Sequence, residues 1–153
     1  MLKDGGGGGN APPLFHIGGG MASDETASIL LVEDNPLNRA LLEQMLEWLA
    51  LAADQAEDGL QAVEMARVGA YRLILMDVQM PVMNGLEATR LIRASDLAWQ
   101  PRIVAMTASA FTEDRQRCRD AGMDGMLIKP FRLEELRQMI DACLSGGQNL
   151  PSL

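Results

Sequence analysis

The sequence predicts an α/β fold in which helices cover both faces of a parallel sheet. Five short apolar runs alternate with five stretches of helical periodicity, which is typical of parallel strands joined by crossover helices. The runs are about as long as strands buried on both faces, and turn signals bound them. Four of the five runs end in a polar side chain, and open α/β sheets place their chemistry at that edge.

Length and composition set broad limits. The 153 residues suit one domain with a full-sized core, and 48% of them are hydrophobic, which is ordinary for a globular protein. The net charge of -8 argues against binding to a nucleic-acid backbone, which requires a basic patch. No apolar run approaches the ~20 residues of a membrane span, and no signal-peptide pattern begins the chain. We therefore expect a cytoplasmic protein, or the cytosolic part of a larger one.

Residues with reactive side chains outside the strand ends are few. Cys118 and Cys143 are far apart and match no metal-binding spacing. Both fall in helical patterns, so we expect buried or half-buried free thiols, which suits a reducing compartment. The single histidine, His16, lies in a glycine-rich stretch and is not expected to act as a base or phosphate donor.

The two ends of the chain differ from the rest. Residues 1–27 hold eight of the 15 glycines and are typical of a flexible leader or linker. Two origins remain open, either a vector leader before an original start at Met21 or a native interdomain linker. We expect one folded domain at residues 28–145 and a disordered tail at residues 146–153.

The first half of the domain contains three expected strands. Ile29–Val32 is the first, and the paired carboxylates Glu33-Asp34 follow it. A run from about Leu51 to Ala56 is a weaker candidate, because it is rich in alanine and poor in β-branched residues. Leu73–Met76 is the third and ends at Asp77.

Helix signals separate these strands. Asn35 is a suitable N-cap with Pro36 at the first helical position, and the helix is expected to reach Trp48. Asp58-Gly59 begins a second helix, and Asn84 caps a third after a breaker segment. The second helix extends to about Val68 with Leu60, Val63 and Arg67 in one row, and the third covers Leu86–Ala94. The predicted buried stripe of the first helix contains Leu37, Leu41, Met45 and Trp48.

The second half continues the alternation. Arg102–Met106 is a strand ending at Thr107, and Met126–Ile128 is a strand ending in Lys129-Pro130. Between them a helix begins near Thr112 and stops at Gly122, which suits a left-handed terminal position. The apolar side of the last helix, which runs from about Leu133 to Leu144, contains Leu133, Leu136, Ile140 and Leu144.

The polar residues at the strand ends form the candidate site. Because parallel strands share an edge, we expect Glu33, Asp34, Asp77, Thr107 and Lys129 to lie together. Three nearby carboxylates raise one another's pKa values, and a hard cation such as Mg²⁺ relieves this repulsion. A hydroxyl and an ammonium beside Mg²⁺ suit a phosphoryl group. No glycine-rich loop is placed to hold a nucleotide, so a small molecule or another protein would be the donor and a carboxylate the acceptor.

Each of these residues has a simpler interpretation when taken alone. Glu33-Asp34 could begin the first helix, where acidic side chains favour the helix dipole. Asp77 could form a turn, Thr107 could cap a strand end, and Lys129 could be solvated. Their joint placement at successive strand ends outweighs the separate interpretations.

Four segments resemble the receiver domain of two-component response regulators. They read ILLVEDNPLNR, LILMDVQMPVMNGLEATR, IVAMTA and GMLIKPF, they occur in the order of the family, and the resemblance covers residues 28–145. The chain is most similar to the CheY-like receivers of hybrid sensor histidine kinases. The resemblance implies a flavodoxin-like (βα)5 fold with strand order 2-1-3-4-5, and a parent that could be a membrane-bound hybrid kinase.

The resemblance also implies a role for each site residue. Asp77 would accept a phosphoryl group from the phosphohistidine of a histidine kinase or histidine phosphotransfer protein. Thr107 would hydrogen-bond that group, and Lys129 would pair with its charge, with a cis peptide before Pro130. The implied Mg²⁺ ligands are Asp34 and Asp77 directly, Glu33 through a metal-bound water, and Gln79 through its backbone carbonyl.

The sequence departs from the family pattern at several positions. Met126 stands where Tyr or Phe is frequent, so an aromatic two-state switch is not expected. Arg72 replaces a common acidic residue and Arg132 a common helix cap. Gln79 and Ser109 occupy positions that tune spontaneous dephosphorylation in the family.

We interpret the chain as a phosphoacceptor signalling domain and not as an enzyme. We expect its partner to dock a helix near Leu37, Asn38 and Leu41, and we expect no nucleic-acid or membrane contact by this domain. One alternative is a phosphorylation-independent pseudo-receiver that serves as an interaction scaffold, although such domains normally lack one of the acidic residues or the lysine. A second is a hydrolase of small phosphate esters, for which no histidine or extra carboxylate is placed as a second acid or base.

Overall fold

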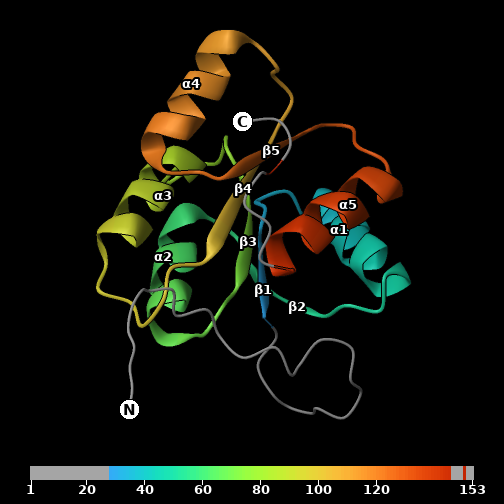
Figure 1. The fold of residues 1–153 in the computed structure, drawn as a ribbon, viewed down its shortest axis with the longest axis horizontal. Helices are drawn as coiled ribbons and strands as arrows, with labels where there is room; N and C mark the ends of the chain where they lie inside the picture. The colour runs from blue at the N-terminus through green and yellow to red at the C-terminus, as the bar shows by residue number, and fades with distance from the viewer. Residues whose placement is uncertain (1–27, 146–149, 151–153) are drawn as a thin grey trace.

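The computed structural model describes residues 28–145 and residue 150. Its strands form one parallel sheet in the order β2-β1-β3-β4-β5, which confirms the expected strand order (Figure 1). The predictions made for residues 1–27, 146–149 and 151–153 lie outside the described residues. Within residues 28–145, no helix is long and apolar enough to cross a membrane. The strands are β1 (Ile29–Val32), β2 (Ala53–Ala56), β3 (Leu73–Asp77), β4 (Arg102–Thr107) and β5 (Gly125–Ile128).

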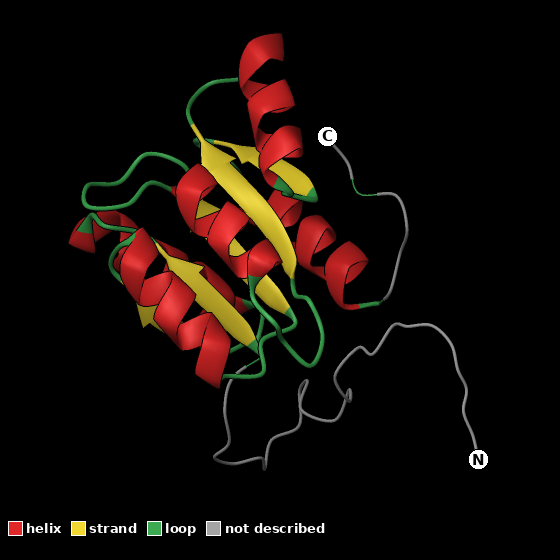
Figure 2. Ribbon diagram, turned by 90° about the vertical axis from the view of Figure 1, so that its left-hand side faces the viewer, coloured by secondary structure: helices red, strands yellow, loops and turns green. Residues whose placement is uncertain are grey.

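Helices cover both faces of the sheet, as the alternation of elements predicts. Figures 1 and 2 show α1 and α5 on one face, with α2, α3 and α4 on the other. The parallel strands need these crossover helices, because a tight hairpin cannot join parallel neighbours. The helices are α1 (Pro36–Trp48), α2 (Gly59–Val68), α3 (Gly85–Ala94), α4 (Thr112–Ala121) and α5 (Leu133–Leu144).

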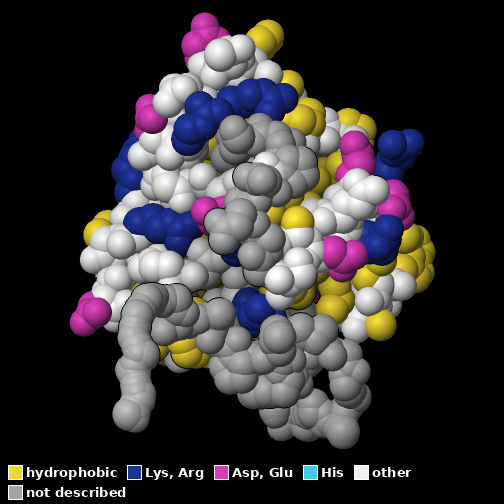
Figure 3. Space-filling model, viewed as in Figure 1, with side chains coloured by type: hydrophobic (Ala, Val, Ile, Leu, Met, Phe, Trp, Pro, Cys, Tyr) yellow, Lys and Arg dark blue, Asp and Glu magenta, His cyan; other side chains and the backbone are white. Residues whose placement is uncertain are grey.

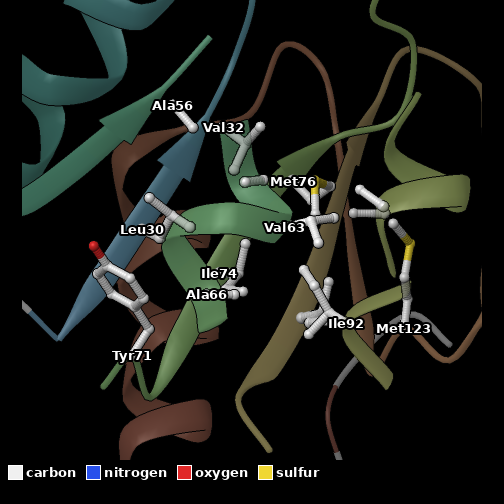
Figure 4. Close-up of a cluster of buried hydrophobic side chains, with 14 of the residues drawn as sticks. Leu30, Val32, Ala56, Val63, Ala66, Tyr71, Ile74, Met76, Ile92 and Met123 are labelled. Carbon is white, nitrogen blue, oxygen red and sulfur yellow. The ribbon is translucent and has the colours of Figure 1, made fainter. Parts of the chain in front are cut away.

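The core consists of two apolar layers, one on each face of the sheet. Leu30 and Val32 of β1 pack toward α2 and α3, whereas Ile29 and Leu31 pack toward α1 and α5. Successive strand residues point to opposite faces, so the central strands must be apolar throughout. Figure 4 shows the first of these layers, with Ile74 and Met76 of β3 beside the helices.

The predicted buried stripe of α1 is wrong at three of its four positions. Leu37, Leu41 and Trp48 are 79%, 57% and 64% exposed, and Met45 alone of the four is buried. The helix is apolar on two adjoining faces, and the face that meets the sheet contains Leu42, Met45 and Leu46. Periodicity locates an apolar stripe but does not select between two neighbouring stripes.

Smaller differences occur around the edge strand β2. The strand begins at Ala53, two residues later than expected, because Ala50 adopts a positive φ of 62° and the Leu51 N–H donates to Leu46 O. In the following helix, Val63 is buried while Leu60 and Arg67 of the predicted row are exposed. The remaining buried positions of α2 are small, which lets the helix approach the sheet closely.

Several local predictions are confirmed. Gly122 follows α4 with a φ of 108°, in the left-handed conformation expected for a helix end. The Lys129–Pro130 peptide is cis. Both cysteines are buried free thiols, and burial raises the pKa of Cys143 to about 12.

Candidate functional site

The site lies at the carboxyl edge of the sheet, where β1, β3, β4 and β5 end side by side. Asp77 is the last residue of β3 and is 5% exposed, and Glu33, directly after β1, is 1% exposed. Val32 is in register with Met76, and Asp77 is in register with Met106 of β4. The strand order therefore brings together residues that are 44 to 96 positions apart in the chain, namely Glu33 with Asp77 and with Lys129.

Three carboxylates converge at this edge. Glu33, Asp34 and Asp77 each place an oxygen within 4.8 Å of one from each of the others. Glu33 is held by the Asn35 N–H, which donates to its Oε2 (3.2 Å). Asn35 in turn caps α1 by accepting from the N–H groups of Leu37 and Asn38, so the helix start fixes the carboxylate.

Lys129 supplies the opposite charge. Its Nζ lies 3.3 Å from Asp77 Oδ1 and 3.2 Å from Glu33 Oε1. The Lys129 N–H donates to Thr107 O (2.8 Å), which ties the end of β5 to the end of β4. One ammonium thus faces two nearly buried carboxylates.

Burial and charge repulsion control the ionisation of Asp77. Desolvation, followed by repulsion from Glu33, raises the pKa of Asp77 from its ordinary 3.8 to about 7. Attraction to Lys129 and the hydrogen bond from the Gln79 N–H oppose this rise. The carboxyl is therefore poised to change its charge near neutral pH.

The β3–α3 loop wraps closely around Asp77. The Gln79 N–H donates to Asp77 Oδ1 (3.4 Å), and the Gly85 N–H donates to Val78 O (2.9 Å). A Cβ on Gly85 would lie 2.3 Å from Asp77 O, so a residue without a side chain is needed there. Within residues 28–145, no hydrogen bond engages the Gln79 carbonyl, so its oxygen has lone pairs available. Its role as a metal ligand stays a prediction.

Thr107 ends β4 and is 8% exposed. Its Oγ1 accepts a hydrogen bond from the Ser109 N–H (3.1 Å), and within residues 28–145 no hydrogen bond joins it to Asp77. Ser109 also donates through Oγ to the Asp114 carboxylate. Sequence reasoning missed Asp114 as a neighbour of the site, although an acidic residue in the first turn of α4, five residues beyond Ser109, is a visible signal.

The donor set fits a hard divalent cation. Three carboxylates carry more negative charge than one lysine balances, and two of them are nearly buried. Oxygen ligands in such a cluster are those that Mg²⁺ prefers, with water completing its coordination. The cluster predicted from the strand ends is therefore present, and its chemistry suits Mg²⁺.

The family model of the response regulator receiver domain matches residues 29–141. The chain belongs to this family. The receiver domain of the sensor histidine kinase PA1611 from Pseudomonas aeruginosa has 41% sequence identity and a TM-score of 0.73, over 79% of this chain and 99% of that one. That structure has a magnesium ion coordinated in its active-site cleft.

Two further relatives extend the comparison of this receiver domain. The Saccharomyces cerevisiae receiver domain of Ssk1, solved with the histidine phosphotransfer protein Ypd1, has 31% identity and a TM-score of 0.72, over 78% of this chain and 90% of that one. Hybrid signal transduction histidine kinase B from Dictyostelium discoideum is 42% identical over 77% of this chain. The chain spans only 7% of that kinase's length. The expected family and its link to hybrid kinases are confirmed.

The family departures also have structural counterparts in this receiver domain. Met126 is 1% exposed in β5, so a thioether fills the position where an aromatic ring is frequent. Arg72, directly before β3, donates through Nη2 to Leu144 O (2.8 Å), which ties the segment before β3 to the end of α5. Arg132 precedes α5, where its N–H donates to the Glu135 carboxylate (2.7 Å) and its own side chain forms no capping bond.

Proposed function

We propose that this chain, through residues 28–145, accepts a phosphoryl group on Asp77 in a two-component or phosphorelay pathway. The observation that carries the proposal is the placement of Asp77 Oδ1 3.3 Å from Lys129 Nζ, beside two further carboxylates at the carboxyl edge of the sheet. A reactive carboxylate, a metal-binding cluster and a counter-charge are the groups that phosphoryl transfer to an acid requires.

The chemistry follows from the positions of these groups. A carboxylate oxygen of Asp77 attacks phosphorus, the new P–O bond forms as the P–N bond of a phosphohistidine breaks, and the electron pair stays on the imidazole. Lys129, whose Nζ lies 3.3 Å from Asp77 Oδ1, stabilises the charge of the transferring group. Without a bound cation the pKa of Asp77 is about 7, and the positive charge of a bound Mg²⁺ would favour its ionised, attacking form.

A bound Mg²⁺ would neutralise the carboxylates and the phosphoryl oxygens. Asp34 and Asp77 would hold it directly, Glu33 through a water, and Gln79 through its carbonyl. The magnesium-containing PA1611 receiver supports this assignment, since the two chains have 41% identity. The Thr107 hydroxyl would donate a hydrogen bond to a phosphoryl oxygen.

The proposed donor is a histidine kinase or histidine phosphotransfer protein. The Ypd1 complex of a receiver with 31% identity supports such a partner. Leu37 and Leu41 expose apolar surface on α1, and a cavity of about 150 Å³ lined by Asn38, Leu41 and Lys129 links that surface to the site. Figure 3 shows hydrophobic side chains along the right-hand edge of the molecule, on the side where α1 lies in Figure 1. Leu41→Asp should slow transfer from such a partner, and Leu60→Asp on α2 is the matched control.

A phosphorylation assay tests the proposal. Incubation with Mg²⁺ and acetyl phosphate should add one phosphoryl group to the mass of the wild-type chain, and Asp77→Asn should abolish the adduct. Asp96→Asn, an exposed carboxylate after α3, should leave it unchanged. Absence of an adduct in the wild type would contradict the proposal. Rapid turnover of many phosphate esters would favour a hydrolase, whereas we expect a phosphoacceptor that is not an enzyme in its own right.

A further inference from the structure

A chain of hydrogen bonds joins the hydroxyl of Thr107 to the surface of α4. The Ser109 N–H donates to Thr107 Oγ1 (3.1 Å), and the Ser109 hydroxyl donates to Asp114 Oδ2. Asp114 Oδ1 accepts from Arg117 Nη2 (2.5 Å), one turn further along the helix. We call Thr107, Ser109, Asp114 and Arg117 the α4 hydrogen-bond network.

Asp114 is the central member of the α4 hydrogen-bond network. Its two carboxylate oxygens are divided between Ser109 and Arg117, so each neighbour holds a different oxygen. These two hydrogen bonds lower the pKa of Asp114, which keeps the carboxylate ionised and its bonds charge-assisted. Asp114 also lies in the first turn of α4, where a negative charge favours the helix dipole.

Two longer hydrogen bonds also hold the segment between Thr107 and α4: the Phe111 N–H donates to Ser109 Oγ (3.4 Å), and Arg115 Nε donates to Ala110 O (3.3 Å). The N-cap of α4 is Phe111, whose side chain is 72% exposed and forms no capping bond. Cys118 and Ala121 are the buried residues of α4, and Figure 3 shows basic side chains gathered over this helix. Of the two hydrogen bonds at Ser109 Oγ, the one to the Asp114 carboxylate is charge-assisted, so it is the stronger attachment of Ser109 to α4.

A cavity beside the α4 hydrogen-bond network leaves space for a second position of the β4–α4 loop. The cavity, of about 350 Å³, is lined by Thr107, Ser109 and Asp114 on one side and by Val78 and Gln79 on the other. This cavity separates the β4–α4 loop from the loop that wraps around Asp77. Thr107 is turned to its own loop, with its oxygen engaged by the Ser109 N–H.

We propose that Asp114 is a positioning residue that, through Ser109, holds Thr107 in this orientation and so opposes its turn toward a group on Asp77. The inference rests on the proposed function, because it concerns how Thr107 reaches the phosphoryl group. For a ligand that binds only when Thr107 is turned toward Asp77, the apparent affinity is reduced in proportion to the fraction of molecules in that state. Loss of the Asp114 carboxylate should therefore tighten the binding of a phosphoryl analogue.

Beryllofluoride with Mg²⁺ is the probe, and calorimetric titration gives its Kd. Asp114→Ala should lower the Kd about three- to tenfold, the range expected for loss of one partly exposed charge-assisted hydrogen bond. Asp120→Ala is the matched control, because Asp120 is an exposed carboxylate of the same helix bonded to Gln116. It should leave the Kd unchanged.

A double-mutant cycle tests the path through Ser109. Ser109→Ala should also lower the Kd, and the Ser109→Ala/Asp114→Ala double variant should gain little more, because both changes break the same link. In NMR spectra without ligand, the Thr107 methyl resonance of Asp114→Ala should shift toward its wild-type beryllofluoride-bound position. A purely structural role for Asp114 would lower the melting temperature without this directed shift.

Each outcome bears on one of the two proposals. A Kd that is unchanged or raised in Asp114→Ala, while the wild type binds beryllofluoride, overturns the positioning role and leaves the proposed function standing. Additive effects in the double variant also overturn it. A wild type that binds no beryllofluoride contradicts the proposed function, and the inference fails with it.

Discussion

The ammonium of Lys129 lies 3.3 Å from Asp77 Oδ1, although 52 positions separate the two residues in the chain. The same Nζ lies 3.2 Å from Glu33 Oε1. Both carboxylates are nearly buried, and the lysine side chain is 27% exposed. Lys129 is therefore placed to balance the two carboxylates and, under the proposed function, to pair with a phosphoryl group on Asp77.

Replacement of Lys129 should slow phosphorylation more than it unfolds the chain. Lys129→Met keeps the stem but removes the charge, and the rate with acetyl phosphate should fall about 10²- to 10³-fold, as for loss of one transition-state donor. A time course by intact-mass measurement gives the rate. Arg132→Met, an exposed cation three residues further on, should react like the wild type. A rate within twofold of wild type for Lys129→Met would contradict its role.

The raised pKa of Asp77 predicts a pH-dependent stability in the absence of divalent cations. The pKa of Asp77 is about 7 in the folded chain and near 3.8 when unfolded, so the folded state binds more protons between these values. The favourable contribution of Asp77 to the free energy of unfolding is complete below about pH 4 and is lost as the pH rises through about 7. Because asparagine does not ionise, Asp77→Asn should not lose stability in this way as the pH rises.

Urea unfolding at pH 5 and at pH 8 measures the effect. The stability of Asp77→Asn relative to wild type should increase between these pH values by ~1–3 kcal/mol. Asp96→Asn should show no such change. A difference between Asp77→Asn and wild type that does not vary with pH would show that the ionisation of Asp77 is not coupled to folding.

A side chain at Gly85 should disrupt the site directly. A Cβ there would lie 2.3 Å from Asp77 O and 3.0 Å from Val78 Cα, and backbone atoms cannot move without displacing Asp77. Gly85→Ala should cost roughly 2 kcal/mol or more of unfolding free energy and should weaken beryllofluoride binding. At Gly125 a Cβ would meet the flexible Met139 Sδ at 3.1 Å, so Gly125→Ala is a milder control. Equal binding by Gly85→Ala and wild type would refute the expected displacement.

Arg93 should matter for stability and not for phosphorylation. It donates to Asp124 (2.7 Å), to Gly122 O (2.8 Å) and to Pro101 O (2.7 Å), far from the carboxyl edge. Arg93→Ala removes the Arg93 donor from Gly122 O and Pro101 O and leaves Asp124 with the Ile103 N–H and Arg102, and it should cost about 2–4 kcal/mol. Thermal unfolding measures the cost, with the exposed Arg90→Ala as control. The extent of phosphorylation below the melting temperature should match the wild type, and a large loss there would place Arg93 in the functional site.

Much of the fold and the candidate site could be predicted because the burial of each strand is evident from the strand's own residues. The runs before Glu33, Asp77 and Lys129 are apolar at every position, since both faces of each strand are covered. Parallel order then brings those residues together without any knowledge of side-chain packing.

Other features depended on contacts between elements. The exposed row of Leu37, Leu41 and Trp48 is as apolar as the buried row of α1, so only its packing against the sheet distinguishes the two. The side-chain bond from Ser109 to Asp114 depends on how the β4–α4 loop folds back onto its helix.

The sequence by itself determined the order of strands and helices, the polar residues at their ends and the family of this chain. The tertiary structure alone decided which face of α1 is buried, how Asp114 connects to Thr107 and how strongly Asp77 is perturbed. The physical reason is range: periodicity and turn preference act over a few neighbouring residues. Burial, charge repulsion and side-chain hydrogen bonds depend on residues that meet only after the chain has folded.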